Sequence, residues 1–244
     1  VEPYVLDSTP VYFDIVPEEA SEQDGVTVVV VEKENMPQKG TISLYKDGEV
    51  FSSVTTAGGG DSPLLYQPVY AKAGLVGGVY DVVATEDIIS GGVLRHHKGD
   101  TVATLTTGSD GWATSELLYL STYQIFERKA PYGMVLNPEP ITVVLSYAGQ
   151  HAQFTTAEAH ITNERQKVQI DLTKILEQDE RFGLGTNGEI RHVAWGLYAA
   201  EQLTAADGST IPADGLLEIL YCDETGKATF KTDVPADSKL YVKE

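Results

Sequence analysis

The chain has 244 residues, 42% of them hydrophobic, and a formal charge of −19 at pH 7. That length can hold one large domain or two ordinary ones, each with its own core. The negative charge argues against nucleic acid and anionic membranes as partners, because phosphate groups would be repelled. No apolar run is long enough to cross a membrane, and any secretion signal is expected outside this stretch.

Cys222 is the only cysteine. An intrachain disulfide is therefore impossible, and a site built on a Cys-x-x-Cys pair is excluded. The five histidines lack metal-ligand spacing, and the sequence has no phosphate-binding, dinucleotide-binding or nucleophile-elbow motif. We therefore predict no metal and no cofactor. If the protein is exported, its stability must come from something other than disulfides.

Alternation of apolar and polar residues predicts short strands along most of the chain, which is typical of an all-β protein built from sandwiches. In TISLYK (41–46), the side chains of Ile42, Leu44 and Lys46 share one face of the predicted strand. Residues 26–31 form an apolar run with the length of a buried strand. The other alternating runs are VYFDIV (11–16), YQIFE (123–127), ITVVLSY (141–147), VQIDLTK (168–174) and LYVKE (240–244).

Five Asp-Gly pairs punctuate these runs and predict turns or hairpins. They begin at Asp24, Asp47, Asp110, Asp207 and Asp214. Sustained helical periodicity is scarce. A short helix near residues 175–182 is compatible with the sequence but is not required by it.

The chain repeats itself. NMPQKGTISLYK (35–46) and NERQKVQIDLTK (163–174) are identical at six of twelve positions. Downstream, GGVYDVVATEDI (77–88) resembles WGLYAAEQL (195–203), GSDGWATS (108–115) resembles DETGKATF (223–230), and YQIFE resembles LYVKE. The next segment, RKAPYGMVLNPEPITVVL (128–145), has its echo at the start of the chain, in VEPYVLDSTPVYFDI (1–15).

The phase of this repeat predicts the domain organisation. Residues 39–163 form one complete unit, residues 164–244 supply the first two-thirds of a second, and residues 1–38 supply the last third of a unit. Three arrangements are open: residues 1–38 complete 164–244 of another molecule head to tail, the second sandwich closes within one chain, or the segment has two frayed ends. Matching lengths and motifs favour strand complementation, because an incomplete sandwich leaves backbone groups unpaired.

The order of these motifs resembles that of Cna B-type, or SpaA-like, prealbumin-fold domains of Gram-positive surface adhesins and pilins. The shared pattern is a first strand ending in Lys, the GGVY segment, a T-x-x-D-G turn, the YQIFE strand, the APYGMVL loop (130–136) and a final strand ending in Asn. The resemblance covers the chain once intact and once split. It implies tandem β-sandwich modules that form stalks, located outside the cell and anchored to the cell wall of a Gram-positive bacterium.

Many domains of this kind carry a spontaneous isopeptide bond between a first-strand Lys and a last-strand Asn, promoted by a Glu. Carried over, the resemblance assigns Lys46, Asn163 and the catalytic acid Glu127 to one complete set. A second set would consist of Lys174, the catalytic acid Glu244 and Asn35. The second unit departs from the pattern at Leu240, which stands where the first has Tyr123.

The expected chemistry needs these residue types. Burial disfavours the charged forms of both an amine and a carboxylic acid. A neutral acid can donate a hydrogen bond to the amide oxygen and relay protons from the amine to the departing ammonia. Holding the groups at near-attack distance removes roughly 7–11 kcal/mol of the barrier. The reaction turns over once, so we do not expect an enzyme.

The predicted function is that of a structural stalk or fibre module of a surface adhesin or pilus. Its expected partners are other copies of itself, head to tail or as neighbouring tandem domains, with no nucleic acid and no membrane contact in this segment. The alternative is a ligand-binding domain for a host matrix protein or glycan, through the aromatic residues Tyr66, Tyr70, Trp112 and Trp195. Core packing is the expected role of the two tryptophans.

Overall fold

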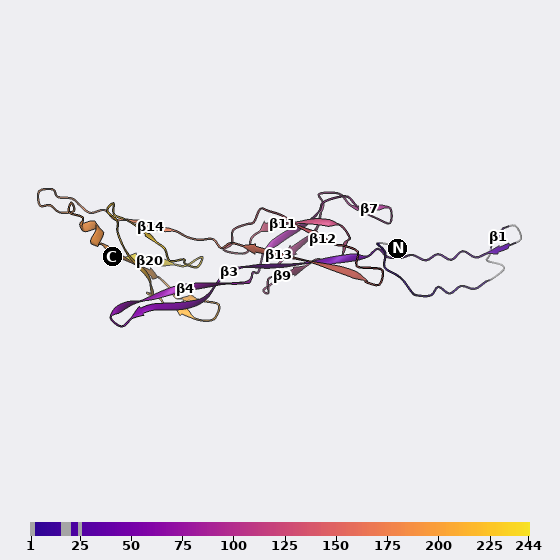
Figure 1. Cartoon of the computed structure of the whole chain (residues 1–244), viewed down its shortest axis with the longest axis horizontal. Helices are drawn as coiled ribbons and strands as arrows, with labels where there is room; N and C mark the ends of the chain where they lie inside the picture. Colours follow the sequence, from indigo (N-terminus) through magenta and orange to yellow (C-terminus); the bar gives the residue numbers. More distant parts are fainter. Residues whose placement is uncertain (1–2, 16–20, 24–25) are drawn as a thin grey trace. The chain divides into compact units, whose positions relative to one another are not determined.

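The computed structural model describes residues 3–15, 21–23 and 26–244, and it confirms the predicted all-β fold (Figure 1). The chain divides into two compact units. The first contains the described residues up to Lys46, Val76–Ala130 and Leu136–Ile161. The second contains Asp47–Leu75, Pro131–Val135 and Thr162–Glu244.

The first unit is a sandwich of two sheets. One sheet has the order β12–β11–β5–β8, and the other has β3 at its centre, with β9, β10 and β13 as neighbours. The strands are β3 (Lys39–Gly59), β5 (Val79–Ala84), β8 (Thr101–Thr106), β9 (Trp112–Thr114), β10 (Leu118–Tyr119), β11 (Thr122–Lys129), β12 (Ile141–Val144) and β13 (Phe154–Asn163). Two short hairpins are added, β1 (Ser21–Gln23) with β2 (Val26–Val28) and β6 (Ile88–Ser90) with β7 (Val93–His96).

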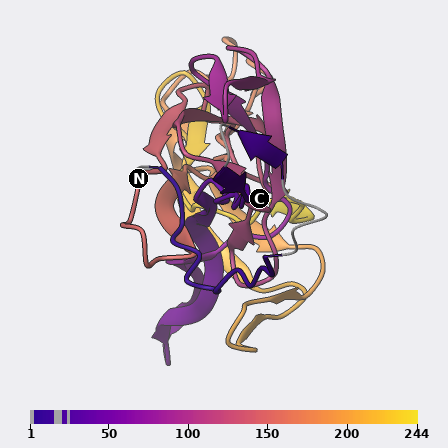
Figure 2. The ribbon, with the colours of Figure 1, turned by 90° about the vertical axis from the view of Figure 1, so that its right-hand side faces the viewer.

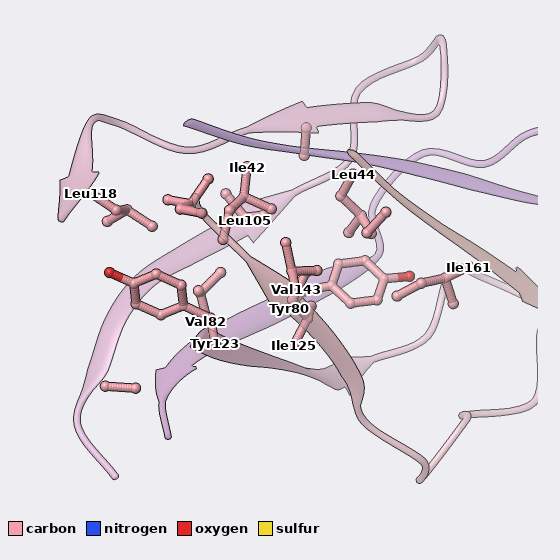
Figure 3. Close-up of a cluster of buried hydrophobic side chains, with 14 of the residues drawn as sticks. Ile42, Leu44, Tyr80, Val82, Leu105, Leu118, Tyr123, Ile125, Val143 and Ile161 are labelled. Atoms are coloured by element: carbon pink, nitrogen blue, oxygen red, sulfur yellow. The ribbon is translucent and has the colours of Figure 1, made fainter. Parts of the chain in front are cut away.

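The core of the first unit lies between its two sheets, where the apolar faces of the strands meet (Figure 3). Two tyrosines are fully buried within it. In Figure 3 the hydroxyl group of Tyr123 points toward Leu118, while that of Tyr80 lies at the opposite end of the cluster, beside Ile161. The remaining labelled members are Ile42, Leu44, Val82, Leu105, Ile125 and Val143.

The second unit has smaller sheets. β15 lies between β18 and β20, β14 pairs with β19, and β16 pairs with β17. The strands are β14 (Ile170–Thr173), β15 (Ala194–Ala199), β16 (Leu203–Thr204), β17 (Thr210–Ile211), β18 (Leu216–Tyr221), β19 (Lys227–Phe230) and β20 (Leu240–Lys243), with one 3-10 helix at Glu189–His192. The core comprises Leu197, Ala199, Ile211, Leu217, Phe230 and Val234.

A long hairpin completes the second unit. The distal part of β3 pairs with β4 (Ser62–Gly74) in an antiparallel register that runs from Asp47 opposite Gly74 to Gly59 opposite Ser62. This hairpin is the long purple ribbon in Figures 1 and 2. Phe51, Val54 and Tyr66 of the hairpin pack against the second core. A segment placed early in the sequence therefore contributes apolar surface to the later unit.

Two expected N-terminal strands are not formed as predicted. Residues 11–15 of VYFDIV form no strand and are exposed, and residue 16 lies outside the described part of the chain. In the run at residues 26–31, only Val26–Val28 are in a strand, and Val30 is exposed. Alternation and apolar character fix the faces of a strand, but burial requires a second layer to cover it.

The turn predictions hold at three of the five Asp-Gly pairs. Turns occur at Asp110, Asp207 and Asp214, whereas the pair at Asp24 lies outside the described residues. The turn predicted at Asp47 is wrong, because Asp47 and Gly48 lie inside β3, where pairing with β4 extends the strand. No helix forms over residues 175–182.

Candidate functional site

Lys46 is fully buried on the inner face of β3. The predicted alternation is confirmed, since Ile42 and Leu44 are buried on the same face. The backbone N–H of Lys46 donates to the carbonyl oxygen of Gly111 at 2.8 Å, and its Nζ donates to the carbonyl oxygen of Ile161 at 3.3 Å. Full burial is rare for a lysine side chain in a folded protein, so Lys46 stands out among the candidate residues.

Glu127 lies on the inner face of β11 and is only 9% exposed. Both of its carboxyl oxygens are held. The hydroxyl group of Tyr80 donates to Oε1 at 2.8 Å, and the backbone N–H of Asn137 donates to Oε2 at 2.6 Å. Tyr80 is also the cross-strand partner of Glu127 between β5 and β11. The carboxyl group is therefore fixed in orientation before any reaction.

Sequence reasoning did not identify Tyr80 as a site residue. Burial, and then the hydrogen bond to Glu127, raise the pKa of the Tyr80 hydroxyl well above its ordinary value. The hydroxyl group therefore remains a protonated donor at neutral pH. The Gly-x-Tyr motif of both units was the available signal. The Tyr80 ring lies over Gly78, and the Tyr198 ring lies over Gly196, at positions where any β-carbon would clash.

Asn163 is the last residue of β13 and is 3% exposed. It continues the inner face of that strand after Ile161, because side chains alternate with a period of two. The Thr162 hydroxyl group donates to Oδ1 of Asp47 at 2.6 Å, and a β-carbon at Gly48 would lie 2.9 Å from the Asn163 carbonyl oxygen. The end of β13 thus lies against the residues of β3 that directly follow Lys46.

The second predicted set has a different environment. The Nζ atom of Lys174 lies 2.6 Å from Oε2 of Glu244, in an ion pair whose side chains are 26% and 50% exposed. The same nitrogen lies 5.7 Å from the centre of the Trp195 ring. Asn35 is exposed in the first unit. The structure therefore brings Lys174 and Glu244 together at the surface, in contrast to the buried Lys46.

Three of the four candidate ligand-binding aromatics pack within the second unit. Tyr66 and Trp195 lie against its core. The Tyr70 hydroxyl group donates to the carbonyl oxygen of Asp233, and the Arg165 guanidinium lies 3.7 Å from the centre of its ring. Burial raises the pKa of Tyr70 to about 12. Trp112 is exposed instead of packing in the core, and its ring centre lies 4.9 Å from that of Tyr45.

Within the described residues, no three side chains of His, Cys, Asp or Glu gather as a metal site would require. In the same part of the chain, no helix combines the length and the apolar character needed to span a membrane.

The comparisons with known proteins agree with the motif order. The family model of the SpaA prealbumin-like fold domain matches residues 75–165. The match begins directly after the β3–β4 hairpin and includes Tyr80, Glu127 and Asn163. A search of curated protein sequences found no match.

Solved structures of low sequence identity also align with the chain. The Bacillus anthracis TIE protein is 17% identical, with 86% of this chain and 32% of that one covered and a TM-score of 0.49. The major pilin SpaD of Corynebacterium diphtheriae is 18% identical (55% and 34% covered, TM-score 0.35), and BcpA, the major pilin subunit of Bacillus cereus, is 20% identical (53% and 31% covered, TM-score 0.31). The chain spans about a third of the length of these proteins. Residues 75–165 thus match the model of the SpaA prealbumin-like fold domain, as the resemblance of the motifs predicted.

Proposed function

We propose that this chain is a stalk module of a Gram-positive surface pilus or adhesin, in which Lys46 and Asn163 are joined by an isopeptide bond. The observation that carries the proposal is the fully buried amine of Lys46. Its Nζ lies 3.3 Å from the carbonyl oxygen of Ile161, which precedes Asn163 by two residues on the same strand face. The match of residues 75–165 to the SpaA prealbumin-like model supports the proposal that the module is of the pilin type.

In the proposed reaction, the uncharged Nζ of Lys46 attacks the side-chain carbonyl carbon of Asn163. A carbon–nitrogen bond forms to Nζ, the bond from that carbon to the amide nitrogen breaks, and the nitrogen leaves as ammonia. Glu127 donates a hydrogen bond to the amide oxygen and carries the proton from the amine to the leaving nitrogen. Tyr80 and the backbone of Asn137 orient the carboxyl group for this role. No oxidant or further reactant is consumed.

The bond would supply the stability that disulfides cannot. Cys222 is the only cysteine and is buried as a free thiol. A covalent link that closes a loop on the order of 100 residues stabilises a domain by roughly 4–5 kcal/mol in the loop-entropy model. An amide link is also resistant to reduction, and it joins the first and last strands of the module. A stalk loaded at its ends would therefore pull on a covalent bond.

Intact-mass spectrometry of the purified chain tests the proposal. The wild-type mass should be lower than the sequence mass by one ammonia for the Lys46 bond, and a proteolytic digest should yield a branched peptide that contains Lys46 and Asn163. Lys46→Arg, Asn163→Ala and Glu127→Gln should each lose that branched peptide and regain the ammonia. Lys39→Arg, on the same strand, is the matched control and should keep both signatures. A folded wild-type chain with the unmodified mass would refute the cross-link.

The exposed Lys174–Glu244 pair fits the same chemistry if a further strand that carries an asparagine covers it. Asn35 stands at the corresponding position of the repeat, so we propose that residues 1–38 of another copy supply that strand. The product would be a covalent chain of molecules. A denaturing gel should then show a ladder that Lys174→Arg removes while the Lys46 bond persists, and a single band for the wild type would argue against this assembly.

A further inference from the structure

The two candidate acids each face an aromatic residue across their sheet. Glu127 faces Tyr80 between β11 and β5. In the second unit, β20 pairs with β15 up to Lys243. The same antiparallel register, continued by one residue, puts Glu244 opposite Trp195. Since Glu244 is the counterpart of Glu127 in the repeat, Trp195 is expected to be the counterpart of Tyr80.

The strand on the other side of β15 gives the same correspondence. Tyr80 faces Leu105 between β5 and β8, and Trp195 faces Leu220 between β15 and β18. In both units, the register with that strand shifts between the second and the third residue after the aromatic one. A bulge marks a specific position in a strand, so the two strands correspond residue by residue. Trp195 therefore occupies the place of Tyr80 in its sheet.

The sequence motif indicates a different residue for this place. The Gly-x-Tyr motif aligns Tyr198, instead of Trp195, with Tyr80. Tyr198 lies three residues further along β15, so its side chain points to the opposite face of the sheet. There its ring stacks on that of Tyr241, with the ring centres 5.1 Å apart. Strand pairing, and not the motif, therefore identifies the aromatic residue opposite Glu244.

The indole nitrogen of Trp195 is a buried donor. Its Nε1 atom has no hydrogen-bond partner among the described residues. A buried tryptophan N–H usually has an acceptor, because a polar group left unpaired away from water costs free energy. In the first unit, the hydroxyl group at this place donates to Glu127. In the second, the corresponding acceptor, Glu244, is bonded to Nζ of Lys174, which lies 5.7 Å from the centre of the Trp195 ring.

We propose that Trp195 is a positioning residue of the second cross-linking set, and that its Nε1–H donates to Glu244 once Lys174 has lost its charge. The inference rests on the proposed bond between Lys174 and Asn35. When the incoming strand covers the ion pair, removal from water favours transfer of a proton from Nζ to the carboxylate. The neutral acid then accepts from Trp195 with one oxygen and donates to the Asn35 amide oxygen with the other.

The reaction then follows the course proposed for Lys46. The Nζ atom of Lys174 forms a bond to the side-chain carbonyl carbon of Asn35, and the bond from that carbon to the amide nitrogen breaks. Glu244 passes a proton from the amine to that nitrogen, which leaves as ammonia. The indole N–H takes no part in the proton transfer. It holds the carboxyl group in the orientation that the transfer requires, as Tyr80 holds Glu127.

Matched substitutions test the role of Trp195 in the reaction. Trp195→Phe removes the donor, whereas Trp195→Tyr supplies a hydroxyl group like that of Tyr80. In a time course on denaturing gels, the ladder should form about tenfold more slowly with Trp195→Phe, and Trp195→Tyr should restore much of the rate. A residue that only packs would give equal rates for Phe and Tyr. The branched peptide of Lys46 and Asn163 is the internal control and should form equally in all three chains.

Nuclear magnetic resonance tests the contact without the cross-link. In a Trp112→Phe background, Trp195 gives the single indole N–H signal. Lys174→Met removes the cation, so the Glu244 carboxylate should turn to the indole. A hydrogen bond to a carboxylate deshields the proton, and the signal should move downfield. Adding Glu244→Ala should return the signal to its original position. Circular dichroism checks that both variants are folded.

The outcomes separate this inference from the proposed bond. A single band for the wild type would refute the bond of Lys174, whereas a ladder that forms equally fast with Trp195→Phe would refute only the role of Trp195. An indole signal that is the same with and without Glu244 in the Lys174→Met chain would overturn the contact, whether or not a ladder forms.

Discussion

Tyr80 and Glu127 face each other across strands β5 and β11, and the Tyr80 hydroxyl group donates to the Glu127 carboxyl group at 2.8 Å. Tyr80 is fully buried, and so is nearly all of Glu127. The pair is therefore a fixed part of the sandwich. Through this hydrogen bond, a tyrosine packed in the core orients the acid that we propose for the reaction at the edge of the core.

Replacing Tyr80 by Phe should lower both the stability of the sandwich and the rate at which the proposed bond forms. Loss of the donor leaves a buried carboxyl oxygen without this partner, which costs about 1–3 kcal/mol of unfolding free energy. The proposed bond should also form more slowly, because Glu127 loses one of the two groups that orient it. Urea denaturation and a time course of intact mass after refolding measure the two effects. Tyr198→Phe, in the Gly-x-Tyr motif of the second unit, pairs across its sheet with Tyr241 and should leave the rate of cross-linking unchanged.

Stability should fall at alkaline pH because of the buried tyrosines. Burial raises the pKa of Tyr123 to about 12, and the pKa of Tyr80 is raised further. An unfolded tyrosine ionises near pH 10, so above that value the unfolded chain binds fewer protons than the folded chain. Each such tyrosine should lower the unfolding free energy by about 1.4 kcal/mol per pH unit until its folded pKa is passed. Below about pH 9 this contribution should be constant.

Urea unfolding at a series of pH values from neutral to strongly alkaline measures that slope. Tyr80→Phe should reduce the slope by the contribution of one tyrosine, about 1.4 kcal/mol per pH unit. Tyr12→Phe, at an exposed position, should not change it. A stability that rises with pH in this range would contradict the assignment.

Gly48→Ala should move the end of β13 away from the middle of β3. A β-carbon at this position would lie 2.7 Å from Cδ1 of Leu75 and 2.9 Å from the carbonyl oxygen of Asn163. The backbone oxygen cannot yield without moving its strand, so the substitution should cost about 1–3 kcal/mol. It should also lower the yield of the proposed bond, as measured by intact mass. Glu49→Ala, at the next residue and exposed, is the control.

Removing the apolar side chains of the hairpin should destabilise the second unit selectively. Phe51 and Tyr66 pack against the second core and are partly buried, so Phe51→Ala should cost about 2 kcal/mol. Each unit contains one tryptophan, Trp112 in the first and Trp195 in the second. In a Trp112→Phe background, the fluorescence of Trp195 should show that Phe51→Ala lowers the urea concentration at which the second unit unfolds. In the reciprocal Trp195→Phe background, the fluorescence of Trp112 should show that Phe51→Ala leaves the unfolding of the first unit unchanged.

The sequence pattern predicted the faces of strands better than their partners. Ile42, Leu44 and Lys46 were placed on one inner face, and they are buried there, because the period of two is a property of the extended backbone. The same reasoning predicted a turn at Asp47 and Gly48. Turn preference is local, and the ladder with β4 overrode it. Gly48 serves the close approach to Asn163 instead.

The destination of the hairpin could not be predicted from the sequence. The apolar residues Phe51, Val54 and Tyr66 indicated that it is covered, but the covering core is formed by residues more than a hundred positions later. Tyr80 could have been found, since the Gly-x-Tyr motif recurs in both units and glycine leaves room for the ring. Its hydrogen bond to Glu127 required the pairing of β5 with β11.

The early place of the β3–β4 hairpin in the sequence has a consequence for biosynthesis. A ribosome releases the chain from its N-terminus, so Tyr66 emerges well before Phe230 and Val234 of the core that it covers. At ordinary rates of synthesis, the hairpin would wait for roughly 8–30 s with its apolar side uncovered. During that interval it is a natural target for chaperones and a hazard for misassembly between nascent chains.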